Sequence, residues 1–277
     1  MNVGIVSDST GYLPEELVPD ELRIVPVTIV IDGRSYDEGV EVSIREVADA
    51  LRRKATVTTS RPSPARFTQV FEELARTGVD EIVSIHLSRA MSATIESAEA
   101  AARKAPVRVH VVDSRTVGNA LGFAALAACK AAREGAAGAE VASLAYRHAE
   151  DSRTWLVVDS LDALRRGGRI GAAQALVGSA LSVKPILQLR DGMVAPSEKQ
   201  RTIGRALARM AELGSQYAGD RECDVIVQHC DAGDRADDVG STLAEKLPNS
   251  EVRVVEVGAA ISAHVGLGAV SLVVAPR

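Results

Sequence analysis

Hydroxyl-bearing side chains gather at four places where an apolar, strand-like run of the sequence ends or a helix-like run begins. The segments are "SDST" at 7–10, "TTSRPS" at 58–63, "LSRAMSAT" at 87–94 and "DSRTVGN" at 113–119. Serine and threonine hydroxyls, together with the free N–H groups at the start of a helix, can hold a small anion. Because none of the four segments contains lysine, the pattern suits a carboxylate as well as a phosphate.

The same residue types are also the usual N-cap residues of helices, so each segment taken alone favours a helix cap over a binding site. Two of the segments contain more hydroxyl groups than a helix cap needs. Residues 58–60 are three hydroxyls in a row, and Ser88, Ser92 and Thr94 share one turn. The four segments together therefore predict an anion site, while capping stays the alternative for each single hydroxyl.

Short β-rich runs alternate with helical runs over the first half of the chain. The pattern predicts strands at 3–8, 23–31, 81–87 and 107–113. It predicts helices at 43–54, 64–77, 92–104 and 119–134. This alternation is typical of βαβ units in a mostly parallel sheet. Ligands bind such sheets beyond the carboxyl ends of the strands, which is where the hydroxyl segments fall.

The second half of the chain has a different pattern. We expect strands at 154–160, 223–229, 251–257 and 270–275, and helices near 172–181 and at 201–218 and 234–247. Two further β runs flank Asp191-Gly192, a dipeptide typical of hairpin turns. The predicted fold is therefore α/β with two domains. Residues 1–150 would form a mostly parallel sheet with flanking helices, and residues 151–277 a mixed α/β sheet. The apolar segment 171–183 fits a core helix or a cavity wall equally well.

Composition and charge exclude several classes of function. The 277 residues are 46% hydrophobic and only 3% aromatic, and the net charge is −5. A negative chain with few aromatic residues has neither the basic surface nor the stacking platforms that nucleic-acid binding needs. The N-terminus lacks the features of a signal peptide and no run is long enough to span a membrane. We therefore predict a cytoplasmic protein with at most transient membrane contact.

No metal or cofactor motif is present in the sequence. The three cysteines, Cys129, Cys223 and Cys230, form no C-x-x-C pair and are expected to be small buried hydrophobes. A G-x-S-x-G nucleophile elbow is absent, as are a Walker sequence and a dinucleotide-binding glycine pattern after the first strand.

A general base for an enzyme would have to come from Asp8, Asp113 or His264. Carboxylates at strand ends, such as the two aspartates, often only accept hydrogen bonds from loop amides. His264 lies in "ISAHVGLGAVS", which we expect to be a glycine-rich turn between two strands. His86 and His110 fall within strand patterns and are expected to be structural.

Several ordered blocks of the sequence resemble the DegV family, bacterial fatty-acid-binding proteins that include the FakB subunits of fatty acid kinase. The blocks are "VSDST", "TTSRPSPARF", "LSRAMSATIESA", "VVDSRTVGNALGF", "LDALRRGGRIG", "KPIL", "DG", "EKQRT" and "HVGLGA". They follow one another along nearly the whole chain. Arg61 and Arg89 depart from the family pattern, at positions that usually hold Gln and Ser.

The resemblance implies a two-domain carrier that holds one long-chain fatty acid in a tunnel, with the carboxylate fixed in the cleft between the domains. The residues that match the family's carboxylate contacts are Thr59 or Ser60, Ser92, the backbone of Ala93, and Arg169 and His264 from the second domain. A separate ATP-using kinase subunit would phosphorylate the bound acid. The resemblance implies no catalytic residue, metal or cofactor in this chain.

Two other functions remain open on the residues alone. An enzyme could use the same hydroxyl segments to hold a small phosphorylated or carboxylated substrate. A ligand-sensing regulator is the third alternative, although no DNA-binding motif supports it.

Overall fold

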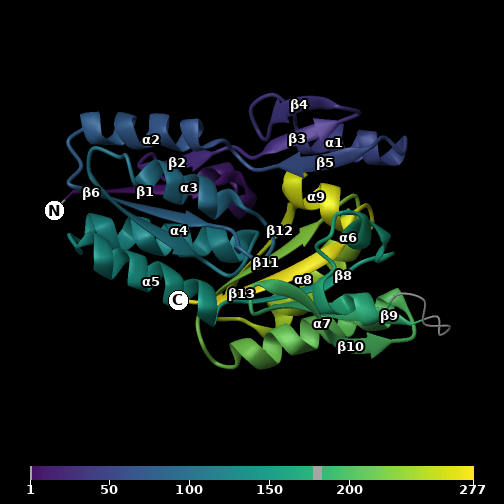
Figure 1. Ribbon diagram of the computed structural model, residues 1–277. Coiled ribbons are helices and arrows are strands. Elements are labelled where there is room, and N and C mark those ends of the chain that lie inside the picture. Colours follow the sequence, from purple (N-terminus) through teal and green to yellow (C-terminus); the bar gives the residue numbers. More distant parts are fainter. Residues whose placement is uncertain (1, 177–182) are drawn as a thin grey trace.

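A four-stranded parallel sheet forms the centre of the first half of the chain. The computed structural model describes residues 2–176 and 183–277 (Figure 1). The strands of this sheet are β1 (Val3–Asp8), β2 (Leu22–Val25), β6 (Glu81–His86) and β7 (Arg108–Asp113). They lie in the order β2-β1-β6-β7, with every pair parallel.

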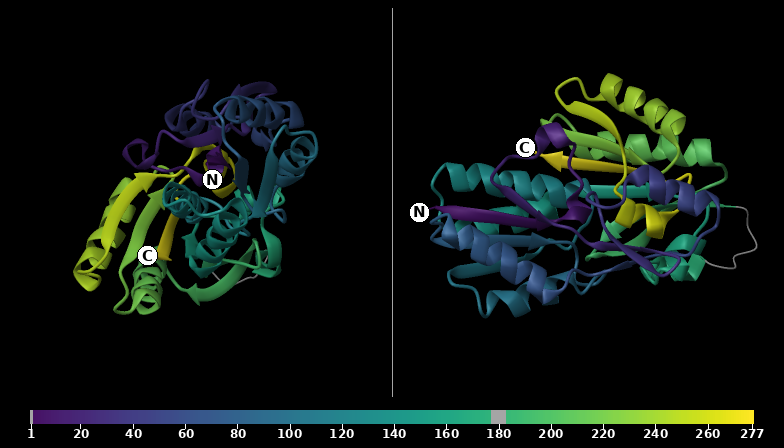
Figure 2. Two further views of the ribbon diagram at one scale, coloured as in Figure 1. Left: turned by 90° about the vertical axis from the view of Figure 1, so that its left-hand side faces the viewer. Right: turned by 90° about the horizontal axis from the view of Figure 1, so that it is seen from above.

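Helices cover both faces of this sheet (Figure 2). These helices are α2 (Pro64–Arg76) and α3 (Thr94–Ala102) on one face, and α4 (Asn119–Arg133) and α5 (Gly138–Asp151) on the other. Val6 of β1 packs with Phe67 and Phe71 of α2, whereas Ile5 packs with Leu121 of α4. Burial on both faces explains why β1 is a continuous apolar run rather than an alternating one.

A six-stranded mixed sheet forms the centre of the second half. Its strands are β8 (Arg153–Val157), β9 (Lys184–Arg190), β10 (Met193–Gln200), β11 (Cys223–His229), β12 (Glu251–Glu256) and β13 (Val270–Pro276). The order is β10-β9-β8-β13-β11-β12, and only β11 and β12 are parallel. The predicted α/β class, with a parallel first sheet and a mixed second sheet, is confirmed. The division into domains 1–150 and 151–277 stays a prediction.

Both faces of the six-stranded sheet carry apolar clusters. Its helical segments are α6 (Asp162–Arg166), the 3-10 helix η3 (Gly171–Leu176), α7 (Ile203–Ala218), α8 (Gly233–Lys246) and α9 (Ala259–Val265). Helices α7 and α8 pack on the outer face (Figure 2). The predicted helix near 172–181 is a 3-10 helix as far as Leu176, and its remainder lies outside the described residues. Ala173 packs in the apolar cluster on the opposite face of the sheet.

A third, small sheet was not predicted from the sequence. It consists of β3 (Thr28–Ile31), β4 (Arg34–Asp37) and β5 (Val57–Ser60), with helix α1 (Ile44–Arg52) between β4 and β5 in the chain. The prediction of one strand over 23–31 is wrong, because Pro26 separates β2 from β3. Proline has no N–H to donate to a strand partner. Strand β5 contains Thr59 and pairs with β3, opposite Ile29.

The turn between β9 and β10 docks on the first half of the chain. Asp191 and Gly192 both have positive φ values, 53° and 78°. A Cβ atom at position 192 would lie 2.4 Å from the Ser88 hydroxyl oxygen. Arg115 forms an ion pair of 2.9 Å with Asp191. Only glycine therefore fits at position 192, both for its backbone angle and for its contact with Ser88.

We expect Gly192→Ala to lower the free energy of unfolding by more than the same change at Gly33. Gly33 ends the Asp-Gly turn of β3 and β4 and also has a positive φ, 83°, but nothing lies within 4 Å of its added Cβ. Each change carries the left-handed backbone cost of about 1–2 kcal/mol. Only Gly192→Ala also displaces Ser88, so urea unfolding should separate the two variants. Equal losses would contradict the docking contact.

Candidate functional site

A cavity lies between the two halves of the chain, and its walls are mostly apolar. Including its open mouth, it contains about 1090 Å³ of empty space. The apolar wall residues are Val27, Leu87, Met91, Val117, Leu156, Leu164, Leu187, Leu189, Val194, Val257, Ala260, Ile261, Val265 and Ala269. Such a space suits a ligand with a long apolar part.

Five of the six predicted binding residues line this cavity: Thr59, Ser60, Ser92, Arg169 and His264. They come from four separate segments, two in the first half and two in the second, so the fold brings together residues far apart in the sequence. The sixth, Ala93, is the N-cap residue of α3 and is not among the described residues that line the cavity. A role for its backbone N–H stays a prediction.

His264 and Thr59 form the closest contact between the predicted residues. The Nε2 atom of His264 lies 2.7 Å from the Thr59 hydroxyl oxygen. His264 stands on helix α9, so the expectation of a turn at this position is wrong. The glycines that suggested a turn, Gly266 and Gly268, follow the helix and have the positive φ values 77° and 81°.

Burial keeps the His264 imidazole neutral. Desolvation, and then the positive charge of Arg169, lower the pKa of His264 to about 4. A neutral imidazole carries one proton. When that proton is on Nε2, His264 donates to the Thr59 oxygen, and the Thr59 hydroxyl hydrogen is free to donate to an anion in the cavity. The Nδ1 atom is then an acceptor, and it is buried without a hydrogen-bond partner among the described residues.

Arg169 links the two halves at the same place. Its Nε donates to the carbonyl oxygen of Met91 at 3.0 Å, and Nη1 donates to the carbonyl oxygen of Gly167. Gly167 also touches His264, because a Cβ atom there would lie 2.3 Å from Nδ1. The positive charge beside the neutral imidazole favours a negatively charged ligand group.

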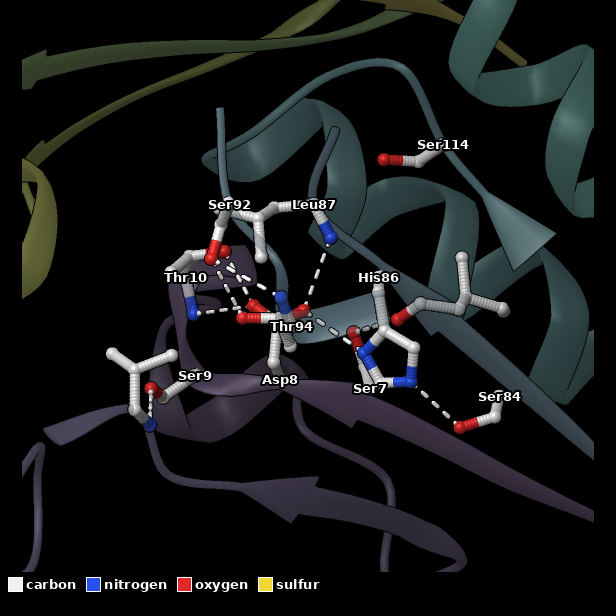
Figure 3. A network of polar contacts seen from close by, with 12 residues as sticks. Ser7, Asp8, Ser9, Thr10, Ser84, His86, Leu87, Ser92, Thr94 and Ser114 are labelled. Atoms are coloured by element: carbon white, nitrogen blue, oxygen red, sulfur yellow. Dashed lines mark hydrogen bonds and ion pairs between the residues drawn. The ribbon is translucent and has the colours of Figure 1, made fainter. Parts of the chain in front are cut away.

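Ser92 lies at the start of α3, where its side chain has two polar contacts. Its hydroxyl oxygen accepts from the Thr94 N–H at 3.3 Å and lies 2.9 Å from the Thr94 hydroxyl (Figure 3). Helix α3 therefore begins at Thr94 rather than at residue 92. Ser88 serves the loop instead, because its oxygen accepts from the N–H of Ala90 at 3.2 Å.

Asp8, a candidate general base, is fully occupied by other partners. One carboxylate oxygen lies 3.0 Å from His86 Nδ1 and accepts from the N–H of Leu87 at 3.0 Å (Figure 3). The other accepts from both the N–H and the hydroxyl of Thr10. His86 is held in turn by Ser84, at 2.7 Å from Nε2. Asp8 and His86 are both completely buried, so this network positions the loops at the sheet edge.

Asp113, the second candidate base, has a similar structural role. One of its oxygens accepts from the backbone N–H groups of Arg115, at 2.9 Å, and Arg89, at 3.3 Å. Of the three candidate bases, only His264 faces the cavity.

Glu38 is a functional position that sequence reasoning missed. One carboxylate oxygen accepts from the N–H of Ala260 in the first turn of α9, at 2.7 Å. The other accepts from the Ser9 hydroxyl at 2.5 Å. Burial raises the pKa of Glu38. The residue positions the helix that carries His264, but its partner is 222 residues away in the chain, so no local sequence pattern could reveal it.

The two arginines that depart from the family pattern both pair with α3. Arg61 lines the cavity and forms an ion pair of 3.0 Å with Glu96. Arg89 lies outside the set of described cavity-lining residues and pairs with Glu99 at 2.5 Å. Arg61 is therefore the one that a ligand or partner could meet at the cavity.

The structure also bears on the expectations about cysteines, metals and membranes. All three cysteines are free and buried. Within residues 2–176 and 183–277, no group of three or more His, Cys, Asp or Glu side chains is arranged to hold a metal ion. In the same ranges, no helix has the length and apolar character needed to cross a membrane.

We expect the ligand-free protein to lose stability as the pH falls from about 6.5 to about 4. In this window the unfolded chain protonates His264, whose ordinary pKa is 6.5, while the folded chain, with a pKa of about 4, does not. The loss should reach at most about 3 kcal/mol. Urea unfolding of wild type and His264→Gln at several pH values measures it. If the stability of the two proteins falls equally with pH, the buried neutral imidazole is contradicted. His148, whose pKa is also lowered by burial, titrates in both proteins, so its effect cancels in the comparison.

Comparison with known proteins places the chain among relatives of the same length and fold. A family model described as an uncharacterised protein of the DegV family matches residues 2–277. A DegV domain-containing protein of Streptomyces coelicolor is 45% identical, over 100% of this chain and 99% of its own.

Two solved structures have the same architecture along their whole length. One, from Thermus thermophilus, is described as a fatty-acid-binding DegV family protein; it is 32% identical, covers 100% of both chains and has a TM-score of 0.91. The other, from Bacillus subtilis, is described as DegV, a fatty acid binding protein; it is 31% identical, also covers 100% of both chains and has a TM-score of 0.92. The chain therefore belongs to the DegV family.

Proposed function

We propose that this chain binds one long-chain fatty acid. The observation that carries the proposal is the cavity itself, in which polar groups from both halves of the chain meet otherwise largely apolar walls. The carboxylate would lie against Thr59, Ser92 and Arg169, and the acyl chain would lie along the leucines and valines of the second half. Relatives described as fatty-acid-binding proteins, at 31% and 32% identity, support the same ligand class.

The expected energetics agree with this division of roles. Burying a saturated tail of 16 carbons contributes about 0.8 kcal/mol per CH₂ group, before the costs of association are subtracted. Each hydrogen bond to the carboxylate contributes about 1.5–3 kcal/mol. The tail would therefore supply most of the affinity, and the polar groups would fix which end of the ligand faces the hydroxyls.

The carboxyl end of the ligand would lie close to solvent. Ser60 and Arg61 line the cavity beside Thr59, and both are exposed. A group held there is accessible to a second protein. In this proposal the chain is a carrier that presents the carboxyl group to a fatty acid kinase subunit, which forms the acyl phosphate with ATP. Residues 1–150 would carry the carboxylate site, to which Arg169 is added from the second half, and residues 151–277 would complete the tunnel for the chain.

Ser92→Ala should weaken the binding of palmitate by about 10- to 100-fold, because a hydrogen bond to a charged group is lost. Extraction of the purified protein followed by mass spectrometry, together with titration of a delipidated sample, measures the change. Ser88→Ala is the matched control. Ser88 is buried in the same turn, but it bonds Ala90 and lies outside the set of described cavity-lining residues. Normal lipid retention in Ser92→Ala would contradict the carboxylate assignment.

A second experiment tests the carrier role. The loaded protein is incubated with ATP, with and without the catalytic subunit of a bacterial fatty acid kinase, and acyl phosphate is trapped with hydroxylamine. We expect product only when both proteins are present, and about tenfold less from Ser92→Ala at limiting fatty acid. Turnover of the bound acid by this chain alone would support the enzyme alternative instead.

A further inference from the structure

One wall of the cavity carries a buried polar side chain with nothing to bond. Gln228 is only 2% exposed and lines the cavity. Its side-chain nitrogen, Nε2, has no hydrogen-bond partner among the described residues. A buried carboxamide without a partner is unfavourable, and native proteins rarely leave one in that state.

The strand register places Gln228 in a row that crosses the sheet. Gln228 of β11 pairs with Ser271 of β13, Ser271 pairs with Leu156 of β8, and Leu156 pairs with Leu187 of β9. All four residues line the cavity. The β11 side of this row is polar, with Gln228 and Ser271, and the β9 side is apolar, with two leucines.

Thr154 adds a second unpaired group on the same face. It precedes Leu156 by two residues in β8, so the two side chains point to the same side of the sheet. Thr154 also lines the cavity, and its hydroxyl oxygen is buried with no hydrogen-bond partner among the described residues. Valine has nearly the same shape as threonine and would leave no polar atom unpaired against a plain hydrocarbon chain.

The carboxamide of Gln228 packs against the backbone at Gly118, which also lines the cavity. Its oxygen, Oε1, lies against Gly118, where a Cβ atom would come within 3.1 Å. Gly118 has a positive φ of 71°, and its N–H donates to the Thr10 carbonyl at 3.0 Å. The Gly118 backbone therefore limits where the carboxamide can turn, and its N–H groups need an acceptor in the cavity.

We propose that the cavity accepts a fatty acid whose chain carries an oxygen substituent, a hydroxyl or a keto group. Gln228 Nε2 donates a hydrogen bond to that oxygen, and the Thr154 hydroxyl is a second partner for substituents that lie closer to β8. This inference rests on the proposed fatty-acid function and adds a specificity for the middle of the chain rather than for the carboxyl group.

The test compares palmitate with a set of hydroxy- and keto-palmitates whose oxygen is moved along the chain. Each acid is titrated into the delipidated full-length protein by calorimetry. We expect at least one positional isomer to bind about tenfold more tightly than palmitate, since it gains a hydrogen bond to a buried donor that palmitate leaves unpaired. Gln228→Leu should remove this preference and bind palmitate at least as tightly as wild type.

Two further variants make the result specific. Thr154→Val changes the same wall with almost no change in shape, so it tests the site even when Gln228→Leu does not fold. It should shift or weaken the preference among the isomers. Gln69→Leu is the matched control, because Gln69 lies on the exposed surface of α2 and bonds Glu73; its preference should equal that of wild type.

Each possible outcome decides between the proposals. Palmitate binding without preference for any oxygenated isomer would overturn this inference and leave the fatty-acid function intact, with an ordered water as the partner of Gln228. A preference for an oxygenated isomer that survives in both Gln228→Leu and Thr154→Val would also overturn this inference and leave the fatty-acid function intact. An equal loss of affinity for all acids in Gln228→Leu would assign the residue to the carboxylate. Failure of wild type to bind any of the acids would overturn the fatty-acid function as well.

Discussion

The hydrogen bond from the first turn of α9 to the buried carboxylate of Glu38 is the contact on which the candidate site depends. It joins a residue beside the small third sheet to a helix of the second half. Helix α9 also carries His264 to Thr59 and lines the cavity with Ile261. A shift of its first turn would therefore move a cavity wall and a polar group together. The positive end of the helix stabilises negative charge on Glu38, which offsets part of the cost of burying that carboxylate.

The polar groups around the cavity are oriented before any ligand arrives. Asp8 holds the loop that contains Thr10, Arg169 is held by two backbone carbonyls, and Ser92 is tied to the start of α3. Ordered side chains lose little conformational entropy on binding, so more of each interaction contributes to affinity. No lysine is among the described residues that line the cavity, so no buried ammonium group has to be desolvated there.

Local patterns in the sequence predicted the parallel sheet, the hairpin at Asp191 and most of the helices, because these depend on spacing and turn chemistry. The hydroxyl segments and the family resemblance pointed to five residues that line the cavity, and their role in binding stays a prediction. Long-range contacts could not be predicted in this way. Nothing near Glu38 indicates that it caps a helix of the second half. The position of Gln228 on the cavity wall depends on the register of strands that are more than 30 residues apart.

The place of β13 in the second sheet has a consequence for how the protein is made. This strand, Val270–Pro276, lies between β8 and β11 and supplies Ser271 to the cavity wall. During translation, β8 and β11 have no common neighbour until β13 has left the ribosome. The first sheet, complete at residue 113, can form much earlier. A ribosome that stalls before β13 would thus release a chain with a finished first sheet, an unfinished second one and exposed apolar strand faces. Such a chain is a substrate for chaperones and proteases.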